Sequence, residues 1–102
     1  MNTNDSFVRL KSIIKEVYGI DDVNSDTEIN EFKTLSEDND RFIMLFSSEF
    51  NVDMSSFSYY DYFNEDEFIL LSLINLIVPL NKKKKLTVRH LLLVIQSREW
   101  FD

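Results

Sequence analysis

Residues 36–54 read Ser-Glu-Asp-Asn-Asp-Arg-Phe-Ile-Met-Leu-Phe-Ser-Ser-Glu-Phe-Asn-Val-Asp-Met. They combine an acidic start, a helical pattern of apolar residues and an alternating exit. Phe42, Leu45 and Phe46 recur at the spacing of one helix face, which is typical of a helix packed on a core. After Phe50 apolar and polar residues alternate, as they do in extended chain. The stretch therefore predicts a core-facing helix over about 36–49 with an extended exit.

The residues just before this helix predict how it begins. Thr34 or Ser36 can provide the N-cap, because a hydroxyl at that position accepts a hydrogen bond from a free backbone N–H. Glu37 follows Thr34 at the spacing of a capping box. Asp38 and Asp40 add negative charge near the positive end of the helix dipole.

A second helix is expected upstream, from about Asp5 to Tyr18, with apolar residues at helical spacing. Asp5 can cap its start, and Gly19 can adopt the left-handed conformation that ends a helix. The connection over residues 20–35 is long for a small domain, so we expect it to be packed or functional. Its expected anchors on the core are Ile20, Val23, Ile29 and Phe32.

Two more helices are expected downstream. One begins after Asn64 and runs to about Val78, and its nearly continuous apolar sequence is typical of a buried central helix. The other is capped by Thr87 and closes at Trp100-Phe101. Buried positions are expected at Leu10, Phe46, Leu71 and Ile74.

The composition favours a single all-α domain. A chain of 102 residues with 44% hydrophobic residues is large and apolar enough to form one core. One glycine and one proline leave little turn chemistry for a β-sandwich. The absence of cysteine excludes disulfides, thiolate zinc sites and cysteine nucleophiles.

The net charge of −7 is unevenly distributed. Residues 1–67 carry sixteen acidic and five basic side chains, whereas residues 68–102 carry two and six. An acidic body disfavours nucleic-acid binding, which requires phosphate neutralisation, and suits a basic protein surface. Simple solubility is the alternative explanation.

The sequence predicts neither export nor a membrane span. Its start, Met1-Asn2-Thr3-Asn4-Asp5, lacks the regions of a signal peptide, so we expect a cytoplasmic protein. The apolar run Phe68–Leu80 is shorter than the roughly 20 residues that cross a bilayer.

Catalytic chemistry has little support in the sequence. His90 is the sole histidine, and a position at a helix edge is the simpler expectation for it. One histidine without cysteine cannot build the usual zinc or nucleophile sites. The aromatic-rich segment Phe57–Phe63 could line a ligand groove, but sealing a small core is the expected role. We therefore predict no catalytic residues and no metal site.

Three segments resemble acyl carrier proteins in order and spacing. They are Ile13–Ile20, which is similar to the first helix and its exit, Phe42–Met54, similar to the second, and Thr87-Val88 with Leu91, Leu92 and Ile95, similar to the last. A narrower resemblance, to a small bacterial family of unknown function with an acyl-carrier-like fold, rests on Phe57, Tyr62-Phe63, Leu86-Thr87-Val88 and Trp100. The resemblance implies an acyl-carrier-like four-helix bundle with a long loop between helices one and two.

In carrier proteins a serine at the start of the second helix carries 4′-phosphopantetheine, and the resemblance places that serine at Ser36. The surrounding motif departs from the carrier pattern: Lys33 replaces a glycine, Leu35 an aspartate and Glu37 the leucine after the serine. In the narrower family this position is commonly glycine followed by acidic residues. Ser36-Glu37-Asp38 fits that pattern about as well. The expectation is accordingly that no cofactor is carried, with 4′-phosphopantetheine on Ser36 as the alternative.

These features lead to one expected function and two alternatives. The expected function is a non-catalytic module that binds a basic protein surface, such as that of a biosynthetic enzyme, through Glu31, Glu37, Asp38 and Asp40. The first alternative is a true acyl or aminoacyl carrier. The second is a lipid- or membrane-surface binder that uses the apolar third helix and Lys82–Lys85.

Overall fold

The structure is a computed structural model, and it describes residues 3–32, 34–63 and 83–102. This part of the chain is mostly helical and contains no strand, only two isolated β-bridges. Its elements are α1 (Thr3–Tyr18), the 3-10 helix η1 (Ile29–Glu31), α2 (Ser36–Phe50), α3 (Tyr59–Tyr62) and α5 (Val88–Ser97). The all-α prediction is confirmed for the described residues. The predicted helix after Asn64, with Leu71 and Ile74, lies outside them.

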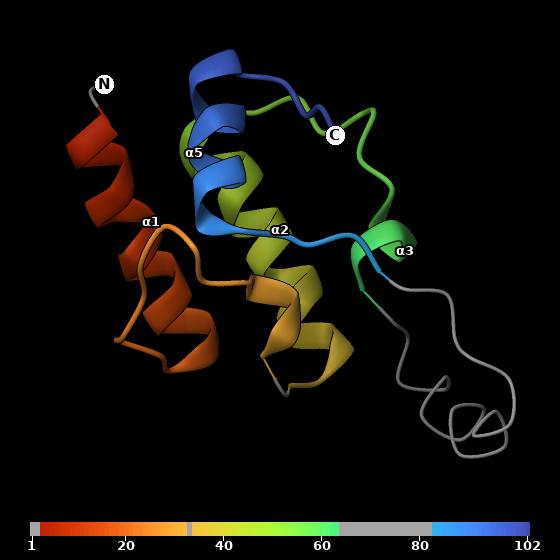
Figure 1. The fold of residues 1–102 in the computed structure, drawn as a ribbon. Helices are drawn as coiled ribbons and strands as arrows, with labels where there is room; N and C mark the ends of the chain where they lie inside the picture. The colour runs from red at the N-terminus through yellow and green to blue at the C-terminus, as the bar shows by residue number, and fades with distance from the viewer. Residues whose placement is uncertain (1–2, 33, 64–82) are drawn as a thin grey trace, which may run out of the picture.

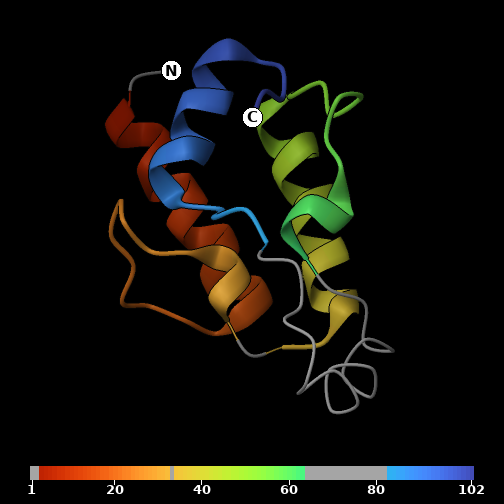
Figure 2. The same cartoon turned by 45° about the vertical axis from the view of Figure 1, so that its right-hand side comes forward.

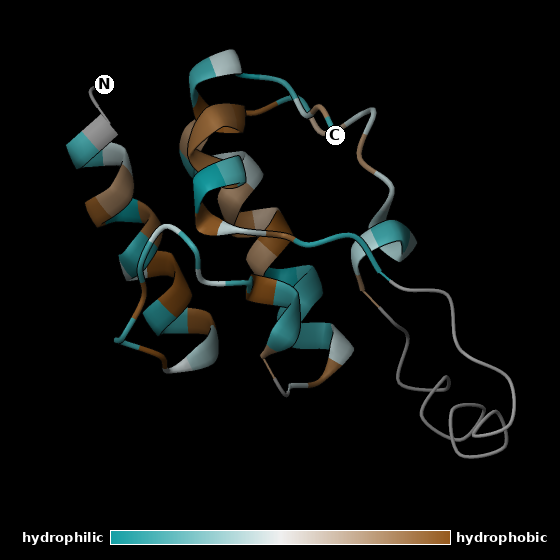
Figure 3. Cartoon of the chain, in the orientation of Figure 1, coloured by the Kyte–Doolittle hydropathy of each residue, from teal (hydrophilic) through white to brown (hydrophobic). Residues whose placement is uncertain are grey.

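The three long helices stand side by side, and α1 contacts both α2 and α5 (Figures 1 and 2). Brown and teal residues alternate along α1 and α2 in Figure 3, as expected for amphipathic helices. The core includes Leu10 and Ile14 of α1, Phe42 and Phe46 of α2 and Leu91 of α5, all fully buried. The predicted burial of Leu10 and Phe46 is confirmed.

The ends of α1 differ in how well the sequence predicts them. Gly19 has a φ of +72° and its N–H donates to the Lys15 carbonyl at 2.8 Å, so it ends α1 as predicted. The helix begins at Thr3, two residues earlier than expected, so Asp5 lies in the first turn and is not the cap.

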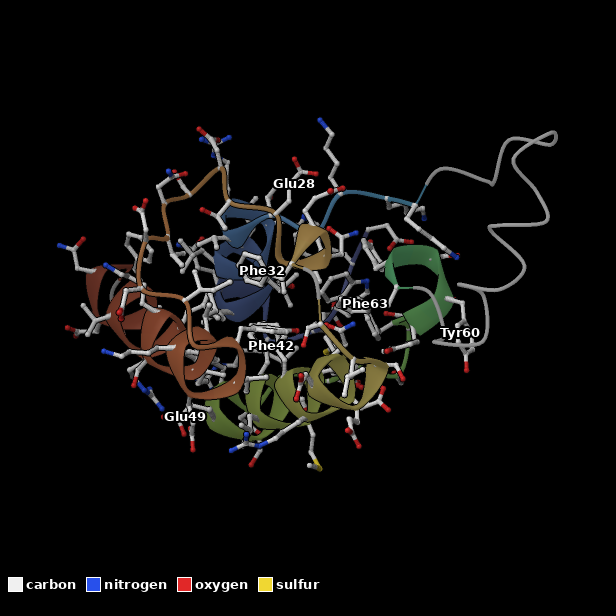
Figure 4. All side chains as sticks on the ribbon, turned by 90° about the horizontal axis from the view of Figure 1, so that it is seen from below. Glu28, Phe32, Phe42, Glu49, Tyr60 and Phe63 are labelled. Atoms are coloured by element: carbon white, nitrogen blue, oxygen red, sulfur yellow. The ribbon has the colours of Figure 1, made fainter. Side chains whose placement is uncertain are left out.

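In α2 the aromatic residues form the buried face. Phe42, Phe46 and Phe50 are all buried at successive intervals of four residues, and neighbouring rings lie 6.1 and 5.5 Å apart. The predicted Leu45 is only partly buried against them. Seen from below, Phe42 and Phe32 point into the space between the helices, whereas Glu49 points outward (Figure 4).

The long connection over residues 20–35 is packed, as predicted. Val23 and Ile29 are buried, and Ile20 and Phe32 pack against the core from its edge. The connection also pairs with the chain before α5 through an antiparallel bridge between Glu28 and Thr87.

Residues 51–63 lead from the end of α2 back to its start, and the chain after α5 pairs with the beginning of this segment at Asp53. Asn51 and Arg98 adopt left-handed conformations after α2 and α5, so the chain turns sharply at both places. The Asp53 N–H donates to the Arg98 carbonyl at 3.0 Å, and the Trp100 N–H donates to the Asp53 carbonyl at 2.8 Å. Because α5 ends at Ser97, the predicted helical closure at Trp100-Phe101 is wrong, and those residues lie outside any helix.

Candidate functional site

The start of α2 is the region that the sequence singles out. Leu35 is the N-cap, with an extended backbone, and its carbonyl accepts from the N–H groups of Asp38 and Asn39 at 3.1 and 3.4 Å. Ser36 is the first helical residue and is half-buried. The predicted N-cap at Thr34 or Ser36 is therefore wrong. The cap is the residue between them, because the backbone is still extended at Leu35 and becomes helical at Ser36.

The Thr34 hydroxyl does not act as the N-cap of the predicted capping box. It donates to the carboxylate of Asp38, a side chain that is itself only half-exposed. This contact ties the segment before α2 to the first turn of the helix. Thr34 thus restrains the helix start through a side chain and not through a backbone N–H.

The predicted acidic residues are unequally exposed. Glu31, at the end of η1, and Glu37 and Asp40, on α2, are exposed, whereas Asp38 is half-buried. Among the described residues none of the four forms an ion pair. Three carboxylates are therefore exposed around the start of α2, and that of Asp40 also contacts the Tyr59 hydroxyl.

Two tyrosines and an asparagine hold the start of α2 through hydrogen bonds. The Tyr18 hydroxyl donates to Asn39 Oδ1 at 2.7 Å, and the Tyr59 hydroxyl donates to the Ser36 carbonyl at 3.3 Å. Burial, followed by the nearby charges of Tyr59 and Asp38, raises the pKa of Tyr18 well above its ordinary value. Burial, followed by the charge of Asp40, raises the pKa of Tyr59 to about 12. Both hydroxyls stay protonated near neutral pH and serve as hydrogen-bond donors.

Exposed apolar side chains accompany the acidic ones. Leu35 is 55% exposed and Met44 is 64% exposed. On α2, Glu37, Asp40 and Met44 are separated by three and four residues, so they share one side of the helix. The outer side of α2 is thus acidic at its start and carries an apolar residue one turn after Asp40.

Asn30 is an organising residue that the sequence analysis missed. Its amide nitrogen donates to the carbonyls of Tyr62 at 2.9 Å and Lys84 at 2.6 Å, and its amide oxygen accepts from the Leu86 N–H at 3.2 Å. It therefore joins the long connection to α3 and to the chain before α5. Its position next to the anchor Ile29 could have indicated that this polar side chain is held against the core. Its hydrogen-bond partners could not be predicted, because they are distant in the sequence.

The aromatic segment Phe57–Phe63 packs as a small core, as predicted. Tyr62 and Phe63 are buried, and the Phe57 ring stacks on Tyr62 with centroids 5.5 Å apart. Tyr60 is the exception, because it is 53% exposed and points away from the core in Figure 4.

His90 lies at the edge of α5, as predicted. Its ring contacts those of Trp100 and Phe101, and Nε2 lies 2.7 Å from the Phe101 carbonyl oxygen. The imidazole thus holds the chain that follows α5.

Within the described residues no group of histidine or acidic side chains is arranged to hold a metal ion. The helices of that part also include none that is long and apolar enough to cross a membrane. The apolar run and Lys82 of the proposed membrane-surface alternative fall outside the described residues.

Comparisons with known proteins do not assign a family. No family model matches the chain, and searches of curated proteins and of solved structures return no match either.

Proposed function

We propose that this chain is a cytoplasmic, acyl-carrier-like helical protein that acts without catalysis by binding a basic surface of a protein partner. The observation that carries the proposal is the set of exposed carboxylates of Glu31, Glu37 and Asp40 around the start of α2. The charge of an acidic side chain is neutralised when it pairs with a neighbouring basic side chain. These three acidic side chains form no ion pair within the described residues. Their charge is therefore available to a partner.

The same surface offers apolar contact. Leu35 and Met44 are more than half exposed, one at the N-cap and one on the outer side of α2. Apolar contacts in the centre of an interface supply most of its binding energy, and complementary charges at the rim mainly raise the association rate. Acidic residues next to exposed apolar ones suit a partner with apolar side chains surrounded by Lys and Arg.

A charge-reversal experiment tests this proposal. Tagged wild-type protein, Glu31→Lys/Glu37→Lys and Asp22→Lys/Glu99→Lys would be used to capture partners from the native host. Both double variants change the net charge equally, and all four positions are exposed. Asp38 and Asp40 are left unchanged because each contacts a side chain that holds the helix start.

We expect the wild type and the Asp22→Lys/Glu99→Lys control to retain one identified partner that the Glu31→Lys/Glu37→Lys variant loses. Its association rate should fall as salt rises, because exposed charges are screened over about 8–10 Å at 0.10–0.15 M salt. Circular dichroism confirms that each variant is folded. A partner that is lost equally from both variants, or whose binding ignores salt, would contradict docking through this face.

The carrier function is the second candidate, and it rests on the position of Ser36 as the first residue of α2. The positive end of the helix dipole favours a phosphate there. The surroundings fit the group poorly, however, because Glu37 and Asp38 lie in the same turn and Ser36 is half-buried.

Intact-mass measurement after co-expression with a broad phosphopantetheinyl transferase distinguishes the two candidates. We expect the mass of the wild type to be unchanged. A gain of one phosphopantetheine that Ser36→Ala abolishes and Ser47→Ala does not would make the carrier function primary.

A further inference from the structure

The carboxylate of Asp102 contacts three donor groups. They lie on the side of the molecule that is formed by α3 and the chain before α5. Its Oδ1 accepts from the Tyr62 hydroxyl at 2.6 Å and from Trp100 Nε1 at 3.2 Å. Its Oδ2 lies 3.3 Å from Lys84 Nζ. Three different types of donor thus converge on one anionic group.

Two of these donors are rigidly held. Tyr62 and Trp100 are 4% and 3% exposed, and both rings pack on Phe57 with centroids 5.5 and 4.7 Å away. The Ser56 hydroxyl also donates to the Trp100 carbonyl at 2.8 Å. By contrast, the side chain of Asp102 is 53% exposed. Tyr62 and Trp100 are therefore fixed parts of the core, whereas the Asp102 carboxylate that they hold is at the surface.

A hollow of about 430 Å³ continues from this point. It is lined by Tyr62, Lys84, Lys85, Thr87, His90 and Asp102. The lining carries two ammonium groups, of Lys84 and Lys85, and one carboxylate, of Asp102, while the Asp61 carboxylate contacts Lys84 from outside the lining. Lys84 is shared between Asp61 and Asp102 at 3.6 and 3.3 Å, while Lys85 is exposed beside it.

We propose that this hollow is a binding site for a small dianion, either a dicarboxylate or a phosphate, and that Asp102 occupies its inner position as a tethered competitor. One anionic group of the ligand takes the place of the Asp102 carboxylate on Tyr62, Trp100 and Lys84. The second negative charge lies toward Lys85. The site shares no residue with the acidic face of α2, so it goes beyond the proposed function and can fail independently of it.

Trp100 gives a direct readout because it is the only tryptophan in the chain. Its indole N–H resonance would be followed by NMR while succinate, inorganic phosphate or acetate is added at constant ionic strength. Succinate and phosphate separate the two ligand chemistries, and acetate tests the need for a second charge. The variants are Asp102→Ala and, as a control with the same loss of charge, Glu99→Ala.

We expect saturable shifts with succinate or phosphate in Asp102→Ala, with affinity on the order of tenfold tighter than in the wild type or Glu99→Ala, because a tethered competitor acts at an effective millimolar concentration. Acetate should bind more weakly than either dianion. Adding Lys84→Met to Asp102→Ala should abolish saturation. Adding Lys83→Met should not, because Lys83 Nζ donates to the Tyr60 carbonyl outside the lining.

The proposal is overturned if the indole resonance of Asp102→Ala shows no saturable shift with either dianion. It is also overturned if wild type and Asp102→Ala bind equally well, because Asp102 would then not occupy the site. Equal losses from Lys84→Met and Lys83→Met would indicate a general charge effect and would likewise contradict a defined site.

Discussion

Ser36 and Thr87 both lie at helix starts, but only Thr87 acts as an N-cap. The Thr87 hydroxyl accepts from the His90 N–H at 3.1 Å, which is the interaction expected of a cap. Ser36 lies one residue inside α2, after the cap residue Leu35. The two hydroxyl residues therefore occupy different positions relative to the caps of their helices.

The two hydroxyls give a matched test of stability. We expect Thr87→Ala to lower the free energy of unfolding by about 0.5–2 kcal/mol, since it removes a cap hydrogen bond. Ser36→Ala should cost less, because the residue is not at the cap position. Urea unfolding of both variants measures the difference. A larger loss from Ser36→Ala would show that Ser36 stabilises the start of α2 more than its position indicates.

The buried tyrosine hydroxyls predict a loss of stability at high pH. Burial raises the pKa of Tyr18 and Tyr59 above the ordinary value of 10.0, for Tyr59 to about 12. As pH rises above 10, the tyrosines lose their protons in the unfolded chain before they lose them in the folded one. Their contribution to the free energy of unfolding is therefore complete below pH 10, declines above it and is lost as pH passes the pKa of the folded state. The urea midpoint should fall between pH 9 and pH 11.

The matching control is Tyr18→Phe/Tyr59→Phe, which keeps both rings and removes both hydroxyls. Its urea midpoint should fall less between the same two pH values. If it falls as much as that of the wild type, other groups cause the loss.

At the scale of elements, α2 presents two different sides. Phe42, Phe46 and Phe50 join it to the core, while Glu37 and Met44 face solvent. A helix of this kind is held by its buried side, which leaves its outer side free to vary or to bind. The proposed docking face depends on this division.

Two substitutions on α2 test the division. Phe46→Ala should lower the free energy of unfolding by about 3–5 kcal/mol, because it removes a fully buried ring between Phe42 and Phe50. Met44→Ala, at a side chain that is 64% exposed, should change it by no more than about 0.5 kcal/mol. Chemical denaturation gives both values. Similar costs at the two positions would contradict the described orientation of α2.

At the scale of the whole molecule, the excess of negative charge opposes compaction. The ion pairs of the described residues, such as Lys15–Asp21 and Arg89–Asp26, are exposed, and pairs of that kind contribute about 0–1 kcal/mol each. Even if all 11 basic residues were paired, 7 of the 18 acidic residues would remain unbalanced, which gives the net charge of −7. Repulsion between the remaining acids destabilises the folded chain, because folding brings them together.

We therefore expect the urea midpoint to rise between about 0.01 M and 0.15 M NaCl, as the Debye length shortens from about 30 to about 8 Å. The neutralised variant Glu31→Gln/Glu37→Gln should gain less from salt than the wild type does. A midpoint that falls with salt would mean that the ion pairs contribute more than the repulsion.

Short-range patterns in the sequence predicted the helices and much of the core. Apolar residues at helical spacing located α1, α2 and α5, and Gly19 and Thr87 marked two boundaries correctly. The anchors of the connection, such as Val23 and Ile29, were recognisable because large apolar residues in a polar loop need burial. The acidic positions around α2 were also predicted, though not that Asp38 would be half-buried.

The sequence by itself thus determined where the long helices α1, α2 and α5 lie, much of the described core and where acidic charge gathers. Only the tertiary structure decided that Leu35 is the N-cap of α2, that Asn30 contacts three distant backbone groups and that Asp102 lies against Tyr62, Trp100 and Lys84. Helical periodicity is a local property that neighbouring residues establish. A hydrogen bond between residues 40 or 54 positions apart is not, because it depends on how the folded chain brings distant segments together.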